Sequence, residues 1–441
     1  MKFTSLFIIL LLMGCSDIGD VQDTSKKSST KQETEKDNTD INNIKEEKPK
    51  TDDKTDEVIS EPIKPKPIEP EKPYKNPFQP STEIDPNTPK YIEPIPEKKE
   101  YLNGRELKIL PNIISTDLKL TKNIYWQISG NVKVKTGVKF EIEAGTEIFG
   151  ADASSKIEFQ NSSKLIAIGK KNLPIIFTSK NHILGKESTS GEWGGISLVN
   201  NDGSILKYIQ ILYSGHNQPA LKLENMNYSN IFEFIEIAFS NSDGVQISGG
   251  EINLRNSIIL GANGDGLSVK NGWKGKFQNI YIHQFNGIFG EMSSGLEVGS
   301  DVKTTITNLT INSDSEKVGA GIFIRENAEI HLINSIISGK RAGVCIKAKS
   351  ISENHKFEYN ILNCQNGGFE KVKLDKSINT ILSENTSLEI LSKKVEPINP
   401  YSINGWFDEY SNLYIGSFDF TLVRKWSDGW TFGMEEIFNG K

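Results

Sequence analysis

The feature that most constrains the fold of this chain is a short phrase that occurs seven times between residues 194 and 346. Each copy places two apolar residues, separated by one residue that is polar in five of the seven copies, after small or turn-forming residues. The copies are GGISL (194–198), PALKL (219–223), DGVQI (243–247), DGLSV (265–269), SGLEV (294–298), AGIFI (320–324) and AGVCI (342–346), and consecutive copies begin 22 to 29 residues apart. A second apolar phrase follows each copy, from KYIQIL (207–212) to NILNC (360–364). Repeats of this length, built from short strands and turns, predict a solenoid.

We therefore predict an all-β fold, a single-stranded right-handed parallel β-helix of about 9–11 coils. Each strand would hydrogen-bond to its copy in the next coil, about 4.8 Å away. In DGVQI, Val245 and Ile247 are expected to point into the coil and Gln246 to point outward. Because no single coil can bury its own inward face, the stacking of coils would create the core.

Two residue types recur at fixed places in these repeats. Glycines precede the first strand phrase, where we expect unusual φ values, at Gly244, Gly266, Gly295, Gly321 and Gly343. Asparagines begin the second phrase, at Asn256, Asn279, Asn308, Asn334 and Asn360. We expect the asparagines to form a stacked, hydrogen-bonded ladder, with a ligand-binding face as the alternative.

The N-terminal sequence MKFTSLFIILLLMGCSD predicts an export signal over residues 1–14, because its apolar run is too short to span a bilayer. The order Leu12-Met13-Gly14-Cys15 resembles a bacterial lipobox. That resemblance implies cleavage before Cys15 and lipid attachment to its sulfur, which would anchor the protein to a membrane. Ser16 follows in place of an aspartate, which favours the outer membrane of the cell envelope. The alternative is an ordinary cleaved signal.

Residues 15–110 read as a disordered tether. They are rich in Lys, Glu, Asp, Ser and Thr, and 12 of the chain's 17 prolines fall between Pro49 and Pro96. Such a segment buries too little apolar surface to fold. We expect it to hold a domain away from the lipid surface, with contact to the cell wall as the alternative. The chain has a mild net charge of −6 and no basic stripe, so nothing in it favours nucleic-acid binding.

The β-helix is predicted over residues 111–399, and a solenoid needs protection at both ends. We expect residues 112–131 to close the N-terminal end. Residues 400–441 differ from the repeats in their density of aromatic residues, and we expect them to cap the last coil. An alternative is that some of these rings form a sugar-stacking platform. The candidate ligand-binding tryptophans are Trp193, Trp273, Trp406, Trp426 and Trp430.

Cysteine and histidine usage gives no sign of a metal site or of a cofactor. Beyond Cys15 the chain has only Cys345 and Cys364, 19 residues apart, and no Cys-x-x-Cys pair. A disulfide can form in an exported protein, but we favour two separate thiols. The five histidines are scattered without metal-ligand spacing.

Several strings of the domain resemble a family. NVKVKTGVKFEIEAGTEIFG, LPIIFTS, GEWGGISL and NLYIGSFDF…KWSDGWTFGM are similar to segments of bacterial secreted or lipid-anchored parallel β-helix proteins. The resemblance covers about residues 113–441 and implies the same architecture. It implies little about activity, because fold does not determine function.

An enzymatic reading rests on two aspartates. NSDG (241–244) resembles the Asn-Thr-Asp-Gly motif of polygalacturonases, and Asp243 and Asp265 would lie on neighbouring coils. An inverting hydrolase uses two such carboxyl groups. The Gly-His-Gly and Arg-Ile-Lys motifs of that family are missing, however, from NGIFG (286–290) and SSGLEVGS (293–300). The alternative role of each aspartate is to accept hydrogen bonds from a turn before glycine.

We therefore favour a non-catalytic, lipid-anchored envelope protein that displays its β-helix for adhesion or for binding to glycan or protein. A polysaccharide hydrolase or lyase that uses Asp243 and Asp265 is the second hypothesis. A structural envelope component without a soluble ligand is the third.

Overall fold

The computed structural model describes residues 99–284, 293–313, 319–339, 343–373, 377–384, 387–407, 414–422 and 424–434. All of them belong to one compact unit, Ile92–Lys441. The predicted signal peptide, the lipidation site Cys15 and the tether up to residue 98 lie outside the described residues and stay predictions. Neither short helix in the described ranges has the length and apolar character that crossing a bilayer requires.

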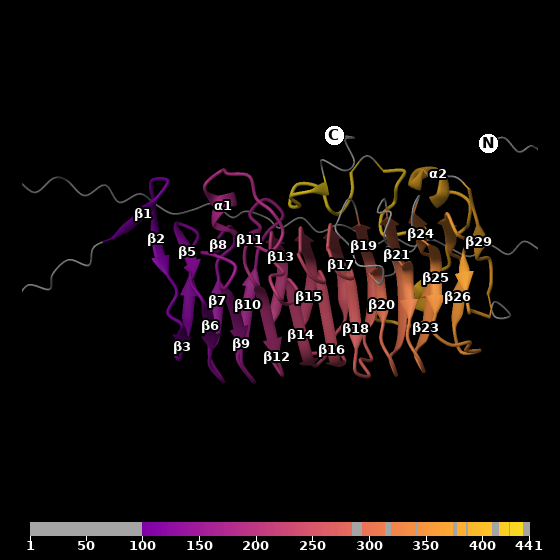
Figure 1. The fold of residues 1–441 in the computed structure, drawn as a ribbon, viewed down its shortest axis with the longest axis horizontal. Helices are drawn as coiled ribbons and strands as arrows, with labels where there is room; N and C mark the ends of the chain where they lie inside the picture. The colour runs from indigo at the N-terminus through magenta and orange to yellow at the C-terminus, as the bar shows by residue number, and fades with distance from the viewer. Residues whose placement is uncertain are drawn as a thin grey trace, which may run out of the picture. The chain divides into compact units, whose positions relative to one another are not determined.

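The described part is a right-handed parallel β-helix, as the repeats predict. Successive coils add strands to two sheets, and the strands lie side by side along the solenoid (Figure 1). The 11-stranded sheet consists of β3 (Ile113–Ile114), β6 (Asn131–Val134), β9 (Lys156–Phe159), β12 (Gly195–Val199), β14 (Leu221–Met226), β16 (Val245–Gly250), β18 (Leu267–Lys270), β20 (Ser294–Val298), β22 (Ala320–Ile324), β25 (Val344–Ala348) and β28 (Phe369–Glu370).

The 18-stranded sheet carries the remaining two sides of each coil. It consists of β1 (Glu100–Leu102), β2 (Arg105–Ile109), β4 (Leu118–Leu120), β5 (Ile124–Ile128), β7 (Lys139–Ile142), β8 (Glu147–Gly150), β10 (Lys164–Ile168), β11 (Ile175–Ser179), β13 (Ile205–Leu212), β15 (Ile231–Ala238), β17 (Leu254–Leu260), β19 (Lys276–Gln284), β21 (Lys303–Ser313), β23 (Glu329–Ile333), β24 (Ile336–Gly339), β26 (Lys356–Glu358), β27 (Ile361–Cys364) and β29 (Ile381–Leu382). The helices are α1 (Lys180–Ile183), α2 (Leu388–Ser392) and a 3-10 helix, Pro400–Ser402.

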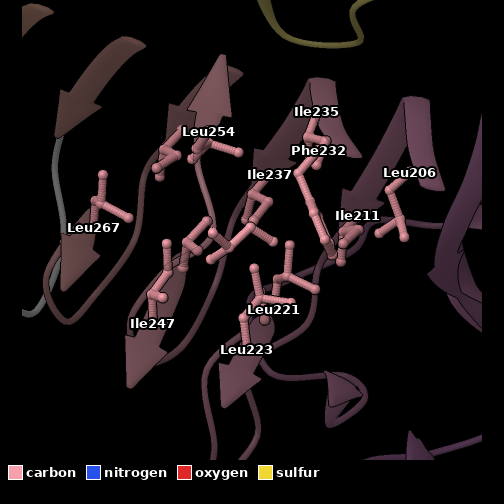
Figure 2. Packing of buried hydrophobic residues seen from close by; sticks show 14 of the residues in the cluster. Leu206, Ile211, Leu221, Leu223, Phe232, Ile235, Ile237, Ile247, Leu254 and Leu267 are labelled. Atoms are coloured by element: carbon pink, nitrogen blue, oxygen red, sulfur yellow. The ribbon is translucent and has the colours of Figure 1, made fainter. Parts of the chain in front are cut away.

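The core is a continuous apolar column inside the coils. Side chains such as Leu206, Leu221, Phe232, Ile247 and Leu267 come from successive strands and point into the interior (Figure 2). Each of them is at most 2% exposed. Burial of one such side chain stabilises a fold by roughly 1.5–3 kcal/mol, so the stacked interior supplies the main stabilising energy.

The recurring glycines are required by packing and not by φ, which corrects the sequence prediction. Gly244, Gly266, Gly295 and Gly321 do not have positive φ. A Cβ added to Gly295 would lie 2.5 Å from Ile311 Cγ2 and 2.9 Å from the carbonyl oxygen of Gly321. The other three glycines meet an isoleucine and the next coil in the same way. A row of glycines therefore faces a row of isoleucines across the interior.

The left-handed conformation lies instead at the asparagine row. Asn256, Asn279, Asn308 and Asn334 have φ between 49° and 55°, where the chain bends between two sides of the coil. Asparagine tolerates this region better than most residues. A ladder bond also forms, because Asn279 Nδ2 donates to Asn256 Oδ1 at 2.9 Å.

Two positions near the C-terminal end are out of the predicted register. Ala320 pairs with Val344 and not with Ala342, so Cys345, and not Gly343, follows Gly321 in the glycine row. Ile336 pairs with Ile361, which places Tyr359 at the bend with φ 57°, while Asn360 is buried next to it. The first shift is by two residues, which keeps every side chain on its face and is invisible to the alternation of residues. The second is by one residue and places the apolar pair Ile361-Leu362 opposite the apolar pair Ile336-Ile337.

Cys345 and Cys364 form a disulfide with a Cα–Cα distance of 5.4 Å. This overturns the expectation of two separate thiols. The register explains it, since β25 and β27 belong to consecutive sides of the last coils and bring the two residues together.

The N-terminal edge begins earlier than predicted. Residues 100–109, which were assigned to the tether, form the antiparallel hairpin of β1 and β2. β2 pairs in parallel with β5, so the hairpin covers the edge of the first coils. Residues 112–131 supply β3, β4 and β5 and are part of the coils themselves.

The C-terminal segment packs along the side of the solenoid, which corrects the prediction that it covers the last coil. It runs back over the flank of earlier coils (Figure 1). Gln210 Nε2 of β13 donates to the carbonyl oxygen of Trp430 at 2.6 Å. Glu236 of β15 accepts hydrogen bonds from the N–H groups of Phe432 and Gly433 at 2.6 and 2.9 Å. We call described residues 388–434 the C-terminal strap.

Candidate functional site

Asp243 and Asp265 lie on adjacent coils, directly before β16 and β18, as their spacing predicts. Asp243 Oδ1 accepts the backbone N–H of Asp265 at 3.0 Å. Asp265 Oδ1 accepts the backbone N–H of Ser294, on the following coil, at 2.7 Å. Each carboxyl group therefore ties its own turn to the turn of the next coil. The aspartates accept backbone N–H groups, as the alternative role proposed, but across coils and not within their own turn.

The second oxygen of Asp243 is also engaged. Oδ2 accepts hydrogen bonds from Ser268 Oγ at 2.8 Å and Gln246 Nε2 at 3.4 Å, and Lys270 Nζ lies 4.0 Å away. The Asp243 side chain is 15% exposed. Its acceptor capacity is thus used largely by the protein itself.

Asp265 belongs to an acidic pair that the sequence analysis missed. Burial, with help from a hydrogen bond to Glu297 and from the charges of Asp243 and Glu297, raises the pKa of Asp265 to about 9. Burial works against ionisation of Glu297, but hydrogen bonds from Asp265 and Arg325 lower its pKa. Arg325 Nε donates to Glu297 Oε1 at 2.6 Å. At neutral pH a protonated Asp265 therefore donates to an ionised Glu297.

The signal for Glu297 was present in the repeat. Glu297 stands in register with Ser268 and Gln246, at the outward position of SGLEV. Its β20 strand borders an open pocket lined by Lys270, Asn271, Gly272, Glu297, Gly299, Ser300, Asp301 and Arg325. We call Asp243, Asp265, Glu297 and Arg325 the acid cluster.

Three of the predicted ligand-binding tryptophans are core residues, which contradicts that expectation for them. Trp193 and Trp273 are 0% exposed and Trp430 is 2% exposed. Their indole N–H groups donate to backbone carbonyls, those of Leu212, Ile252 and Trp426 respectively. A buried ring whose N–H is paired inside the protein has no face for a ligand.

Trp406 and Trp426 are half-buried and belong to the C-terminal strap. The guanidinium of Arg255 lies over the Trp406 ring, 4.4 Å from its centroid, so one face of this ring is covered. Trp426 packs on Phe418 with ring centroids 4.9 Å apart and meets Phe234 edge-on at 6.1 Å.

Trp426 also lines a pocket between the strap and the asparagine bend. The lining residues are Phe234, Asn256, Asn279, Tyr414, Phe418, Asp419, Leu422, Arg424, Lys425 and Trp426. The Tyr414 hydroxyl donates to Asn279 Oδ1 at 3.2 Å, which links the strap to the floor of the pocket. We call this site the aromatic pocket.

The family can be stated from these findings together with the sequence match. The model of the pectate-lyase like beta helix domain matches residues 112–202 and 197–431. The chain belongs to this family. The pectate-lyase-like β-helix therefore includes all the coils from β3 onward and most of the strap, and membership fixes the fold and not an activity.

Two solved structures have low similarity to this chain. The A-module of the mannuronan C-5 epimerase AlgE6 from Azotobacter vinelandii is 8% identical, with 60% of this chain and 91% of that chain covered and a TM-score of 0.21. The catalytic domain of a GH87 alpha-1,3-glucanase in complex with tetrasaccharides is 11% identical, with 62% and 64% covered and a TM-score of 0.18. No curated protein matches this chain.

The chemistry open to the acid cluster of this pectate-lyase-like β-helix is limited by its geometry. Retaining glycosidases hold their two carboxyl groups about 5 Å apart and inverting ones about 6.5–9.5 Å apart. The side chains of Asp265 and Glu297 interact with each other, which is a closer arrangement than either class of glycosidase uses. Within the described ranges, no group of three or more His, Cys, Asp or Glu side chains is arranged to hold a metal ion.

Proposed function

We propose that the protein is an envelope protein, anchored through lipid on Cys15, whose β-helix binds glycan without cleaving it. The observation that carries the proposal is the aromatic pocket, where aromatic rings stand beside amide and charged side chains. The use of both aspartates as acceptors for neighbouring backbone supports a role without catalysis. The lipobox-like sequence supports the anchor.

The lining of the aromatic pocket suits a sugar. A pyranose ring presents an apolar C–H face and a rim of hydroxyl groups, and aromatic rings combined with a few fixed polar groups match both features. Trp426 and Phe234 offer apolar ring surface, while Asn256, Asp419 and Arg424 offer acceptors and donors. The Asn279–Asn256 and Tyr414–Asn279 hydrogen bonds hold this floor in place before a ligand arrives.

A glycan array with full-length protein in non-ionic detergent would identify ligands, followed by calorimetry on the best of them. We expect Trp426→Ala to weaken binding by roughly 2 kcal/mol, about 30-fold, as is typical of an aromatic hot spot. Arg424→Ala should weaken binding as well. Because Arg424 is exposed, this variant tests binding with little effect on folding. Tyr228→Ala is the matched control, because Tyr228 is an aromatic residue 77% exposed in a turn outside the pocket. Unchanged affinity in both pocket variants would refute the assignment.

A second candidate is hydrolysis of a polysaccharide at the acid cluster. The raised pKa of Asp265 favours it, because a protonated carboxyl group is what a general acid needs. Reducing-end assays on a polysaccharide panel separate the two candidates. Cleavage that disappears in Asp243→Asn and in Glu297→Gln would replace the binding proposal by this one.

A further inference from the structure

A second groove runs across four coils, at the first residues of β19, β21, β23 and β26. It shares no lining residue with the aromatic pocket. Its residues are Lys274, Gly275, Lys276, Lys303, Thr304, Thr305, Glu329, Ile330, His331, Asn354 and Lys356. We call it the lysine groove.

The groove is built by register. Lys276 of β19 pairs with Thr305 of β21, Thr305 with His331 of β23, and His331 with Lys356 of β26. Because coils rise by about 4.8 Å each, these four side chains form a column about 14 Å long that runs parallel to the solenoid axis. A ligand that contacts the whole column must be extended.

The lysine groove carries net positive charge. Its two neighbouring carboxylates are already engaged, since Glu329 accepts from Lys303 Nζ at 2.8 Å and Glu358 lies 3.1 Å from His331 Nε2. Lys274, Lys276 and Lys356 form no ion pair with any residue in the described ranges. Three ammonium groups therefore face the groove and its surroundings without a partner carboxylate.

We propose that the lysine groove binds a linear polymer that carries phosphate groups. Lysine is a compact point charge that suits tetrahedral oxyanions, whereas planar carboxylates are best matched by the fork of arginine, which the lining of this groove lacks. The Thr305 hydroxyl and the His331 ring add further hydrogen-bonding groups to the column. The lining has no Phe, Tyr or Trp side chain on which nucleic-acid bases could stack, so the polymer is one without bases.

The test uses full-length protein in non-ionic detergent and fluorescently labelled polyphosphate. Fluorescence anisotropy should show saturable binding that weakens by about tenfold or more between 50 and 200 mM salt, because counterions are released from the polyanion. Lys276→Gln combined with Lys356→Gln should lower the affinity by about tenfold or more. Lys119→Gln combined with Lys135→Gln is the matched control, since it removes the same charge from two exposed lysines near the N-terminal edge.

Three results would overturn the proposal. The first is an equal loss of affinity in both double variants, which would mean a response to net charge alone. The second is equal or tighter binding of polygalacturonate or single-stranded DNA, which would remove the preference for base-free phosphate. The third is displacement of the polymer by phosphatidylglycerol in mixed micelles at matched phosphate, which would make a lipid surface the ligand. The aromatic pocket variants should leave polyphosphate binding unchanged, so this proposal and the glycan proposal can fail independently.

Discussion

The carboxylate of Asp243 accepts a hydrogen bond from the backbone N–H of Asp265, a residue one coil later in the chain, at 3.0 Å. Asp265 repeats the contact with Ser294 on the coil after that. Two acids that look like a catalytic pair in the sequence are thus consecutive members of a hydrogen-bonded chain that runs along the solenoid.

This chain predicts a stability effect at Asp243. Asp243→Ala would leave the Asp265 N–H and the Ser268 hydroxyl without their acceptor, and we expect a loss of about 2 kcal/mol in the free energy of unfolding. Asp243→Asn keeps one acceptor oxygen and should lose less than half as much. Urea denaturation followed by circular dichroism measures both. Equal stability of the wild type and Asp243→Ala would show that the contact does not stabilise the turn.

Glu236 predicts how stability changes with pH. Burial raises its pKa from 4.5 to about 7, against the opposing effect of the Gly433 and Phe432 N–H groups. A group with a raised folded-state pKa stabilises the fold below its unfolded pKa and loses that contribution as the pH rises through the folded value. The wild type should therefore lose roughly 3 kcal/mol from this group between pH 4.5 and pH 7.

Glu236→Gln isolates that contribution, because glutamine stays uncharged at every pH. Glutamine keeps one of the two acceptor oxygens, so we expect the variant to be less stable than the wild type at pH 4.5 and to gain stability relative to the wild type by pH 8. Urea denaturation at both values provides the measurement. If the difference between the two proteins is the same at pH 4.5 and pH 8, Glu236 does not titrate in this window.

The glycine row predicts an unusual pair of outcomes. Gly295 has an ordinary φ but no space, whereas Gly272 has φ 68° and nothing within 4 Å of an added Cβ. Gly295→Ala should lower the free energy of unfolding by about 1–3 kcal/mol through overpacking. Adding Ile311→Ala to this variant should recover part of the loss, because it makes room for the new methyl group. Gly272→Ala should cost only about 1 kcal/mol, from backbone strain. Thermal denaturation of the wild type, Gly295→Ala, Ile311→Ala, their double variant and Gly272→Ala tests this, and additive losses at Gly295 and Ile311 would contradict it.

The disulfide gives a fourth prediction. Apart from Cys15, the denatured protein should show no free thiol until a reductant is added. Replacing both Cys345 and Cys364 by alanine should lower the stability by about 3 kcal/mol, the value expected when a loop of this size is no longer closed in the unfolded chain. Thiol titration with and without reductant is decisive, and two reactive thiols in the unreduced protein would argue against the bond.

The sequence predicts the solenoid well because its evidence is a repeat, and it fails where the repeat is ambiguous. Moving the AGVCI copy by two residues leaves every apolar side chain on the same face, so alternation could not place Val344 opposite Ala320. The same ambiguity hid the pairing of Cys345 with Cys364. The sequence prediction assigned the unusual φ values to the glycines, whereas asparagine occupies the left-handed position at the bend in four coils and Tyr359 occupies it in the next one.

Local sequence pattern could not predict the path of the C-terminal strap. Gln210 and Glu236 occupy outward positions of their strands, where polar residues normally meet water, yet they are 5% and 0% exposed because the strap lies over them. Aromatic identity likewise did not tell the core residue Trp193 from the pocket residue Trp426. For the candidate site, the 22-residue spacing placed Asp243 next to Asp265, while the longer interval before SGLEV hid their neighbour Glu297.

The last prediction concerns the lipid anchor on Cys15. The anchor determines where the two binding surfaces can act. If Cys15 carries lipid, cells fed an alkyne-bearing fatty acid should yield labelled wild-type protein whose mature chain begins at residue 15. Cys15→Ser should lose the label, while the double variant of Cys345 and Cys364 should keep it and serves as the control for cysteine chemistry elsewhere. Protease treatment of intact cells then places the domain, because only a β-helix outside the outer membrane would be degraded. A wild-type protein without label, or a Cys15→Ser variant that keeps it, would refute the lipid anchor and leave an exported protein with an ordinary cleaved signal.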